Sequence, residues 1–328
     1  MRAPDFWYGD TSSVMPVLLR PLGAVFSAGG VLRQLLIKAE AAPVPVICVG
    51  NLVAGGAGKT PVALALADLT RKHGWSPAFV TRGYGGRYKA VALKVEPELH
   101  RSIDVGDEAL LLAAAGPCWV ARDRRAGARA AIVGGADLIV MDDGFQNPGL
   151  RKDLSLVVVD GAVGFGNGRI IPAGPLREPI GRGLARADAV VVMGKDRRDV
   201  AAEFGPAVPV LRAELKVADA DDPLAGRPVV AFAGIGRPEK FFDTLEGIGC
   251  ALLGRHAFAD HHDYSHDEVT SICAEAEIKG AIPVTTEKDA VRLPSDLRAR
   301  VRVLKVVVDW RDVQAVETIL ARLDRDPR

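Results

Sequence analysis

Short runs of apolar, often β-branched residues alternate with longer stretches of helical periodicity along most of this 328-residue chain. This alternation is typical of a mostly parallel sheet wound with helices. In the first two thirds of the chain the pattern predicts strands at residues 44–49, 78–81, 118–121, 138–141, 154–159, 189–193 and 208–211. It predicts helices at residues 60–73, 108–115 and 124–133. The predicted fold class is therefore α/β.

A polar, turn-forming stretch at residues 218–227 follows these elements and is typical of a linker. Beyond it the same rhythm resumes at residues 229–234, 238–248, 266–279, 282–286, 301–308 and 313–323. We therefore expect a larger domain at residues 41–217 and a second, smaller α/β domain at residues 228–328. Residues 1–40 form a separate N-terminal segment in this interpretation.

The N-terminal segment has a different pattern. Residues 14–37 are largely apolar, but Arg20 and Arg33 interrupt them with only twelve residues between, which is too short for a transmembrane helix. No small-residue cleavage site follows, as a secretory signal would require. An amphipathic stretch with aromatic and basic side chains is typical of the membrane interface. A helix packed on the protein's own core explains the same pattern.

Composition and charge restrict the possible partners. The hydrophobic content of 48% is sufficient for a packed core. Lys plus Arg total 42 and Asp plus Glu total 41, so no overall field attracts nucleic acid, and we expect no nucleic-acid partner. The cysteines are scattered without a C-x-x-C pair, which favours reduced, structural thiols over disulfides or a zinc site.

The strongest chemical signal is at residues 50–61 (GNLVAGGAGKTP), between a predicted strand and a predicted helix. Nucleotide-binding proteins of the P-loop NTPase class place a phosphate loop there, because glycines let backbone N–H groups approach phosphate oxygens. Lys59 is placed to reach the β- and γ-phosphates, and the Thr60 hydroxyl to ligate Mg²⁺. The predicted nucleotide contacts are Asn51, Gly55, Gly56, Ala57, Gly58, Lys59, Thr60 and Pro61.

A second signal is the run LIVMDDGFQ at residues 138–146, in which a buried strand ends in two carboxylates. This is the Walker B arrangement, where a carboxylate holds Mg²⁺ directly or through water. Asp142 and Asp143 face opposite ways, so we expect them to have different tasks. Gln146 is a candidate contact to the base or the phosphates. An Asp-Asp-Gly turn that merely ends a strand is the alternative.

Two further polar clusters follow predicted strands or precede predicted helices. Residues 81–86 (TRGYGG) place Arg82 at the end of a strand, on the same edge of the sheet as the phosphate loop. Residues 105–108 (VGDE) place two acids just before a helix, where a carboxylate can enter the cleft.

These motifs resemble one family, the tetraacyldisaccharide 4'-kinases of lipid A biosynthesis. The resemblance runs in family order over nearly the whole chain through GNLVAGGAGKTP, TRGYGG, VGDE, MDDGFQN, IPAGPLREP, FADHH and TTEKDAVRL, and the opening PDFWY is also similar. It implies a kinase that transfers the γ-phosphate of ATP to the 4'-hydroxyl of a lipid-linked glucosamine disaccharide. It also implies ATP and Mg²⁺ as cofactors, a lipid A precursor as substrate and peripheral attachment to the cytoplasmic face of the bacterial inner membrane. We expect a monomer.

The resemblance also implies roles for particular residues. Asp107 corresponds to the family's catalytic base and His261 to its histidine partner, while the adjacent His262 is interpreted as solvated. A carboxylate near its reference pKa of about 3.9 is a weak base at neutral pH, so an imidazole that orients it is sensible chemistry. Glu108 is predicted to hold Mg²⁺ together with Thr60 and one or both of the acids at residues 142–143.

Arg82, Arg124 and Arg177 match the family's functional arginines, whose planar forks suit phosphate oxygens. Arg124 lies in the basic run ARDRR, for which an exposed charged surface is the default interpretation. For Arg177, we expect Glu178 to fix its direction.

The TTEKD segment carries the last candidate residues, Thr286, Lys288 and Asp289. These side chains either close over the nucleotide or substrate when the two domains come together, or simply cap a strand.

Two other functions remain open on the residues alone. A P-loop switch ATPase or metallochaperone-like GTPase has a similar loop. However, Val53 stands where the common loop has its first glycine, Ala54 replaces the lysine of ParA-like proteins, and no N/T-K-x-D motif is present. A soluble small-molecule kinase leaves the aromatic and basic N-terminus unexplained.

Overall fold

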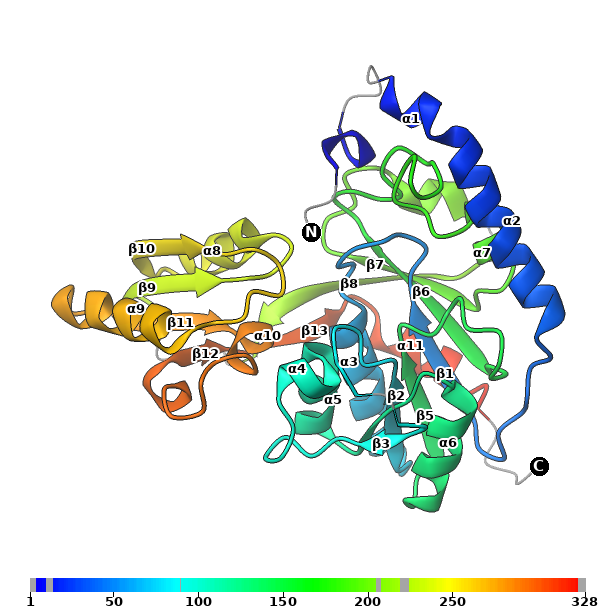
Figure 1. Ribbon diagram of the computed structural model, residues 1–328, viewed down its shortest axis with the longest axis horizontal. Coiled ribbons are helices and arrows are strands. Elements are labelled where there is room, and N and C mark those ends of the chain that lie inside the picture. The colour runs from blue at the N-terminus through cyan, green and yellow to red at the C-terminus, as the bar shows by residue number, and fades with distance from the viewer. Residues whose placement is uncertain (1–3, 10–13, 89, 205–207, 219–223, 324–328) are drawn as a thin grey trace.

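The computed structural model describes residues 4–9, 14–88, 90–204, 208–218 and 224–323. Within these residues the chain forms a larger sheet of nine strands, in the order β13-β8-β7-β6-β1-β5-β2-β4-β3, and a smaller sheet in the order β10-β9-β11-β12 (Figure 1). The larger sheet contains β1 (Val46–Gly50), β2 (Pro77–Thr81), β3 (Leu93–Lys94), β4 (Cys118–Val120), β5 (Leu138–Asp142), β6 (Leu154–Asp160), β7 (Ala189–Met193), β8 (Val210–Val217) and β13 (Val306–Trp310). The smaller sheet contains β9 (Pro228–Ala233), β10 (Ala251–Ala257), β11 (Ile282–Thr286) and β12 (Arg302–Leu304).

Helices cover both faces of each sheet, because the buried strands alternate their apolar side chains between two cores. Ile47 and Val49 of β1 pack in the same core as Val62 of α3, whereas Val46 and Cys48 pack in the core on the opposite face. The helices of the larger sheet are α3 (Lys59–Lys72), α4 (Ser102–Val105), α5 (Asp107–Ala115), α6 (Arg124–Val133), α7 (Ile180–Leu184) and α11 (Val313–Leu320). The helices of the smaller sheet are α8 (Pro238–Gly247), α9 (His266–Ile278) and α10 (Glu287–Ala290). Within the described residues, short 3-10 turns also lie at Asp5–Trp7, Val200–Phe204 and Arg298–Arg300.

The predicted α/β class with a mostly parallel sheet is confirmed. Strand β1 lies between β5 and β6, and all three run parallel. The two edge strands, β3 and β13, run antiparallel to their neighbours. The pattern did not predict β10, because this edge strand carries Gly254, Arg255 and His256 and is only alternately covered.

The end of the chain departs from the predicted division. The pattern treated residues 301–308 as one element of the smaller domain, but the structure divides the run into β12 of the smaller sheet and β13 of the larger one. Strand β13 pairs with β8, and α11 packs its apolar side chains into a core of the larger sheet. The chain therefore crosses between the sheets twice, through the neighbouring strands β8 and β13 (Figure 1). Of the predicted linker, residues 219–223 lie outside the described part, and Leu224 is buried in the smaller core.

The N-terminal helices α1 (Met15–Leu18) and α2 (Arg20–Leu36) lie along one side of the larger sheet and its helices (Figure 1). In α2 only Gly23 is buried, close to the carbonyl oxygen of Ile170. Many of its apolar side chains are exposed, among them Leu22, Val25, Phe26, Leu32, Leu35 and Leu36. No helix among the described residues is both long enough and apolar enough to cross a bilayer. Helix α2 thus covers little of the protein's own core.

Candidate active site

The predicted phosphate loop connects β1 to α3 at the carboxyl end of the larger sheet, with Lys59 and Thr60 in the first turn of the helix. Gly55 and Gly58 have φ angles of 125° and 87°, which other residues adopt only with strain. Two hydrogen bonds from other segments hold the loop at Ala54. The N–H of Ala54 donates to the carbonyl of Pro175 at 2.8 Å, and the Tyr8 hydroxyl donates to the carbonyl of Ala54 at 3.1 Å. A loop shaped in this way can present its amides to phosphate oxygens.

Asp142 ends β5 and faces the first turn of α3. The Thr60 hydroxyl donates a hydrogen bond to Asp142 Oδ2 at 2.9 Å, and the side chain is buried. Burial, reinforced by the nearby Glu108 carboxylate, raises the pKa of Asp142 to about 7. Thr60, Glu108 and Asp142 therefore lie near one another, with oxygen atoms that Mg²⁺ prefers as ligands.

Asp143 lies in a different environment. Arg177 Nη1 donates to Asp143 Oδ1 at 2.8 Å, and Lys59 Nζ lies 3.8 Å from the same oxygen. Burial alone would raise the pKa of Asp143, but Lys59 and Arg177 outweigh it and hold the pKa below the usual value. The two neighbouring acids thus differ in their partners: one contacts a hydroxyl, the other contacts two cations.

Arg124 is not part of an exposed charged surface. Its side chain is 3% exposed, and Nη1 donates to the carbonyl of Ala121 at 2.6 Å, whereas Arg122 of the same run is exposed. Burial lowers the pKa of Arg124 to about 10 even though Asp143 opposes the shift, and the nearby Arg82 lowers it further. The surface interpretation of this basic run is therefore wrong for Arg124. Arg82 is exposed at the end of β2.

Gln146 bridges the phosphate loop and the segment after residue 171. Its Nε2 donates to the backbone carbonyl of Asn51 at 2.8 Å and to Glu178 Oε1 at 3.1 Å, while Arg177 Nη1 lies 3.4 Å from its Oε1. Glu178 also pairs with Arg186. The prediction that Glu178 directs Arg177 is thus wrong, because Arg177 is directed by Asp143 and Gln146. The contact of Gln146 with nucleotide stays a prediction.

The TRGYGG and VGDE segments interlock. Gly106, with φ of 88°, precedes α5, and a Cβ there would lie 2.3 Å from the carbonyl oxygen of Tyr84. A Cβ on Gly83 would lie 2.8 Å from the carbonyl oxygen of Val105. Only glycine fits these close approaches, which fix Asp107 at the first position of α5 with 7% of its side chain exposed.

His261, in the loop after β10 of the smaller sheet, contacts Asp107 at the start of α5, which packs on the larger sheet. It follows β10 with φ of 61°, and its Nδ1 lies 2.8 Å from Asp107 Oδ2. Burial alone would raise the pKa of Asp107, but the hydrogen bond from His261 and the charge of Arg292 outweigh it, so the pKa lies below its usual value. His262 instead pairs with Glu268 at 3.1 Å. The geometry thus separates the tandem histidines that the sequence could distinguish only by resemblance.

The three residues predicted in TTEKD have different surroundings: two are structural, and one lies beside His261. Thr286 accepts from the Asp289 N–H and so caps α10, and Asp289 is fully buried in the smaller core. Lys288 Nζ lies 3.5 Å from His261 Nε2 and 3.6 Å from Asp260 Oδ1. Thr286 and Asp289 therefore have structural roles, but Thr286 caps helix α10 and not a strand, while Lys288 lies beside His261.

Sequence reasoning missed Arg292, whose Nε lies 3.3 Å from Asp107 Oδ2. It is 5% exposed and stands between Val291 and Leu293. The signal that could have found it is its place in the TTEKDAVRL segment, where an arginine among apolar residues indicates a buried partner.

Three buried side-chain atoms in the described part of the chain lack a hydrogen-bond partner: Asn51 Oδ1, Arg124 Nε and Asp142 Oδ1. Buried polar atoms are normally paired, and all three of these belong to the region just described. Their clustering indicates a ligand-binding site. No group of three or more His, Cys, Asp or Glu side chains among the described residues could hold a metal ion. Mg²⁺ at a phosphate site needs only one or two protein ligands, because phosphates and waters supply the rest.

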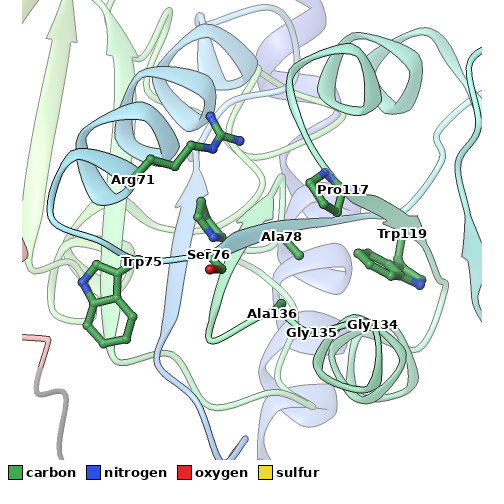
Figure 2. Close-up of a pocket in the computed structure, with 10 residues that line it drawn as sticks. Arg71, Trp75, Ser76, Ala78, Pro117, Trp119, Gly134, Gly135 and Ala136 are labelled. Carbon is green, nitrogen blue, oxygen red and sulfur yellow. The ribbon is translucent and has the colours of Figure 1, made fainter.

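A cavity of about 290 Å³ lies elsewhere, at the amino ends of β2 and β4 (Figure 2). Trp75, Trp119 and the glycines at residues 134–135 line it, and Arg71, also in its wall, donates to the carbonyl of Ala115. Because parallel sheets bind ligands at the carboxyl ends of their strands, this cavity is not the site of the predicted chemistry.

The fold and the site together define a P-loop phosphotransferase: a glycine-dense loop after the central strand, an acidic end on its neighbour and an Asp–His pair at the same edge.

The comparisons identify the family. A family model described as Tetraacyldisaccharide-1-P 4'-kinase matches residues 15–324. A protein of Rhodospirillum centenum named Tetraacyldisaccharide 4'-kinase is 52% identical over 329 residues, which cover 98% of this chain and 97% of that protein. A protein of Paramagnetospirillum magneticum with the same name is 54% identical over 314 residues, which cover 94% of this chain and 95% of that protein. The crystal structure of LpxK from Aquifex aeolicus in complex with ATP superposes with a TM-score of 0.77 at 27% identity, covering 94% of this chain and 99% of that one. The chain belongs to the Tetraacyldisaccharide-1-P 4'-kinase family.

Proposed function

We propose that this protein transfers the γ-phosphate of ATP to the 4'-hydroxyl of a lipid-linked tetraacyl glucosamine disaccharide 1-phosphate, using the site at residues 50–61, 107–108, 142–143 and 261. The match to the kinase family over residues 15–324 supports the reaction. The observation that carries the site is the contact between Asp107 and His261 at the same sheet edge as the phosphate loop. This contact favours a kinase, because a switch ATPase has no alcohol acceptor and so needs no base to take a proton from one.

The nucleotide is assigned to the loop between β1 and α3. Backbone amides at residues 55–58 and the N-terminus of α3 receive the phosphates, and Lys59 neutralises the γ-phosphoryl group. Asp142 and Thr60, with Glu108 nearby, fit Mg²⁺, since Asp142 Oδ1 has no hydrogen-bond partner. When bound, Mg²⁺ would neutralise charge on the β- and γ-phosphates. Asp143 holds Arg177 in place, and the buried Arg124 adds positive charge beside it.

Asp107 is assigned as the general base. An alcohol must lose its proton as it attacks phosphorus, and a positioned carboxylate can accept it. His261 orients the carboxylate through the hydrogen bond from Nδ1. Because the base belongs to α5 and its histidine to the smaller sheet, a closing motion of the smaller domain would change the site directly.

ATP turnover measured with and without a detergent-solubilised lipid disaccharide tests the reaction. A lipid kinase should hydrolyse ATP only slowly alone and transfer phosphate rapidly when the lipid is added. Lipid-independent hydrolysis would favour the switch ATPase. Transfer to a water-soluble sugar but not to the lipid would favour the small-molecule kinase.

Helix α2 is assigned to the membrane, and the protein to the cytoplasmic face of the inner membrane as a peripheral monomer. Leu22, Val25, Leu32 and Leu36 are spaced to lie on one face of the helix, and each is more than half exposed. An exposed apolar face of this kind, flanked by basic residues, is typical of an interfacial helix.

Charged substitutions on α2 should weaken membrane attachment without unfolding the protein. Val25→Asp combined with Leu36→Asp should lower sedimentation with phosphatidylethanolamine–phosphatidylglycerol vesicles by about tenfold or more, since each buried aliphatic side chain contributes roughly 1.5–3 kcal/mol. The matched control is Val133→Asp combined with Ile278→Asp, which changes two apolar residues that are 89% and 87% exposed elsewhere. Equal sedimentation of both double variants would contradict the assignment.

A further inference from the structure

Arg292 follows α10 and is held on several sides by the smaller sheet. Its Nη2 donates to Asp289 Oδ1 at 2.8 Å and to the carbonyl of Gly234 at 3.0 Å, and Nη1 donates to the carbonyl of His262 at 2.8 Å. Its side chain is only 2% exposed. The guanidinium is thus fixed in one orientation, which suits its rigid planar set of donors.

Asp289, which balances this charge, is itself anchored. It is fully buried and accepts from the Gly234 N–H at 2.9 Å and from the Tyr264 hydroxyl at 2.9 Å. Because Asp289 already compensates the charge of Arg292 within the smaller-sheet part of the molecule, Arg292 needs no second carboxylate for its own stability. Its approach to a carboxylate of the larger-sheet part therefore calls for a separate explanation.

That second carboxylate is Asp107. Arg292 Nε lies 3.3 Å from Asp107 Oδ2, and His261 Nδ1 lies 2.8 Å from the same oxygen. A hydrogen bond from His261 and an ion pair with Arg292, whose Nε–H donates to the carbonyl of Lys288 at 3.2 Å, therefore hold one oxygen of the carboxylate. Asp107 Oδ1 remains as the oxygen that can face an acceptor hydroxyl.

We propose that Arg292, anchored by Asp289, is a positioning residue that orients the Asp107 carboxylate so that Oδ1 faces the sugar hydroxyl. This inference rests on the proposed function, in which Asp107 is the base. His261 alone makes a single contact with Oδ2, and the fixed charge of Arg292 attracts the same oxygen, so the carboxylate is held by two side chains instead of one. The orientation of the base thereby depends on the smaller sheet.

Steady-state kinetics of Arg292→Met and Arg292→Lys test the proposal. Misplacing a base by about 1 Å can cost roughly 100-fold, so kcat for the lipid substrate should fall by about 10- to 100-fold in Arg292→Met while KM for ATP stays nearly unchanged. Arg292→Lys should restore little, because an ammonium lacks the fork. Arg300→Met, which removes an exposed arginine after the same segment, should leave both parameters unchanged. A wild-type kcat in Arg292→Met would overturn the proposal.

A double-mutant cycle separates positioning from general damage. In an Asp107→Asn background, Arg292→Met should change kcat by less than about threefold, because there is no base left to orient. An equal loss in both backgrounds would overturn the proposal. If Arg292→Met unfolds, the variant Arg292→Met with Asp289→Asn removes the unpaired buried charge and takes its place.

A crystal structure of the variant gives a readout that does not depend on activity. We expect the Asp107 carboxylate to turn away from its present orientation, and an unmoved carboxylate would count against the inference. A wild-type protein without lipid-dependent transfer would instead count against the proposed function.

Discussion

Replacing Lys59 with alanine is expected to lower kcat by roughly 10²- to 10⁴-fold, the range found when one preorganised charge is removed from a transition state. Lys59 is in the first turn of α3, and its ammonium lies 3.8 Å from Asp143 with 10% of the side chain exposed. The fold should survive, because Arg177 still pairs with Asp143 and no carboxylate loses its last partner. Phosphate transfer to the lipid disaccharide under saturating ATP is the measurement.

The matched control is Lys72→Ala, at the exposed end of the same helix. It should leave kcat within about twofold, since surface lysines contribute little. Circular dichroism should show equal helix content in both variants. A Lys59→Ala protein that retains more than a tenth of wild-type kcat would remove Lys59 from the transition state.

The second large effect is expected for Asp107→Asn, which keeps the shape of the side chain and removes its basicity. We expect kcat to fall by about 10²- to 10⁴-fold with KM for ATP little changed, because general-base catalysis contributes that much and acts only in the transition state. The pH profile provides a further check. Because His261 and Arg292 hold the pKa of Asp107 below its usual value despite burial, the wild-type rate should be lost only at acidic pH, as the carboxylate becomes protonated.

Asp267→Asn is the control for this change, since Asp267 is also a carboxylate in the first turn of a helix but is exposed on α9. Its kcat should equal that of the wild type. An Asp107→Asn protein with near-normal kcat would show that another group, or the phosphate itself, accepts the proton.

The site in the larger sheet depends on contacts from two other parts of the chain, the N-terminal segment and the smaller sheet with its loops. The N-terminal Tyr8 hydroxyl bonds the phosphate loop at Ala54, and the smaller sheet supplies His261 and Arg292 to Asp107. Arg237 and Lys240 of the smaller part also pair with Asp160 at the end of β6. These contacts couple the smaller sheet to the catalytic edge at more than one point.

Much of the site could be predicted from the sequence, because several of its parts are contiguous. The phosphate loop, the acidic end of β5 and the strands β1, β2 and β4–β8 are each written in short windows whose spacing determines which way side chains point. The same local reasoning failed where neighbours in space are far apart in sequence. The burial of Arg124, the partners of Arg177 and the contact of Arg292 with Asp107 belong to this group.

By itself the sequence determined the α/β class and the family, and it predicted the residues that handle phosphate, since hydrophobic periodicity and glycine spacing act over a few residues. Only the tertiary structure decided which histidine meets Asp107, which acid pairs with cations and that β13 returns to the larger sheet. The physical reason is that these arrangements depend on burial and charge between segments up to 154 residues apart. No local pattern records which partner a folded chain brings within hydrogen-bonding distance.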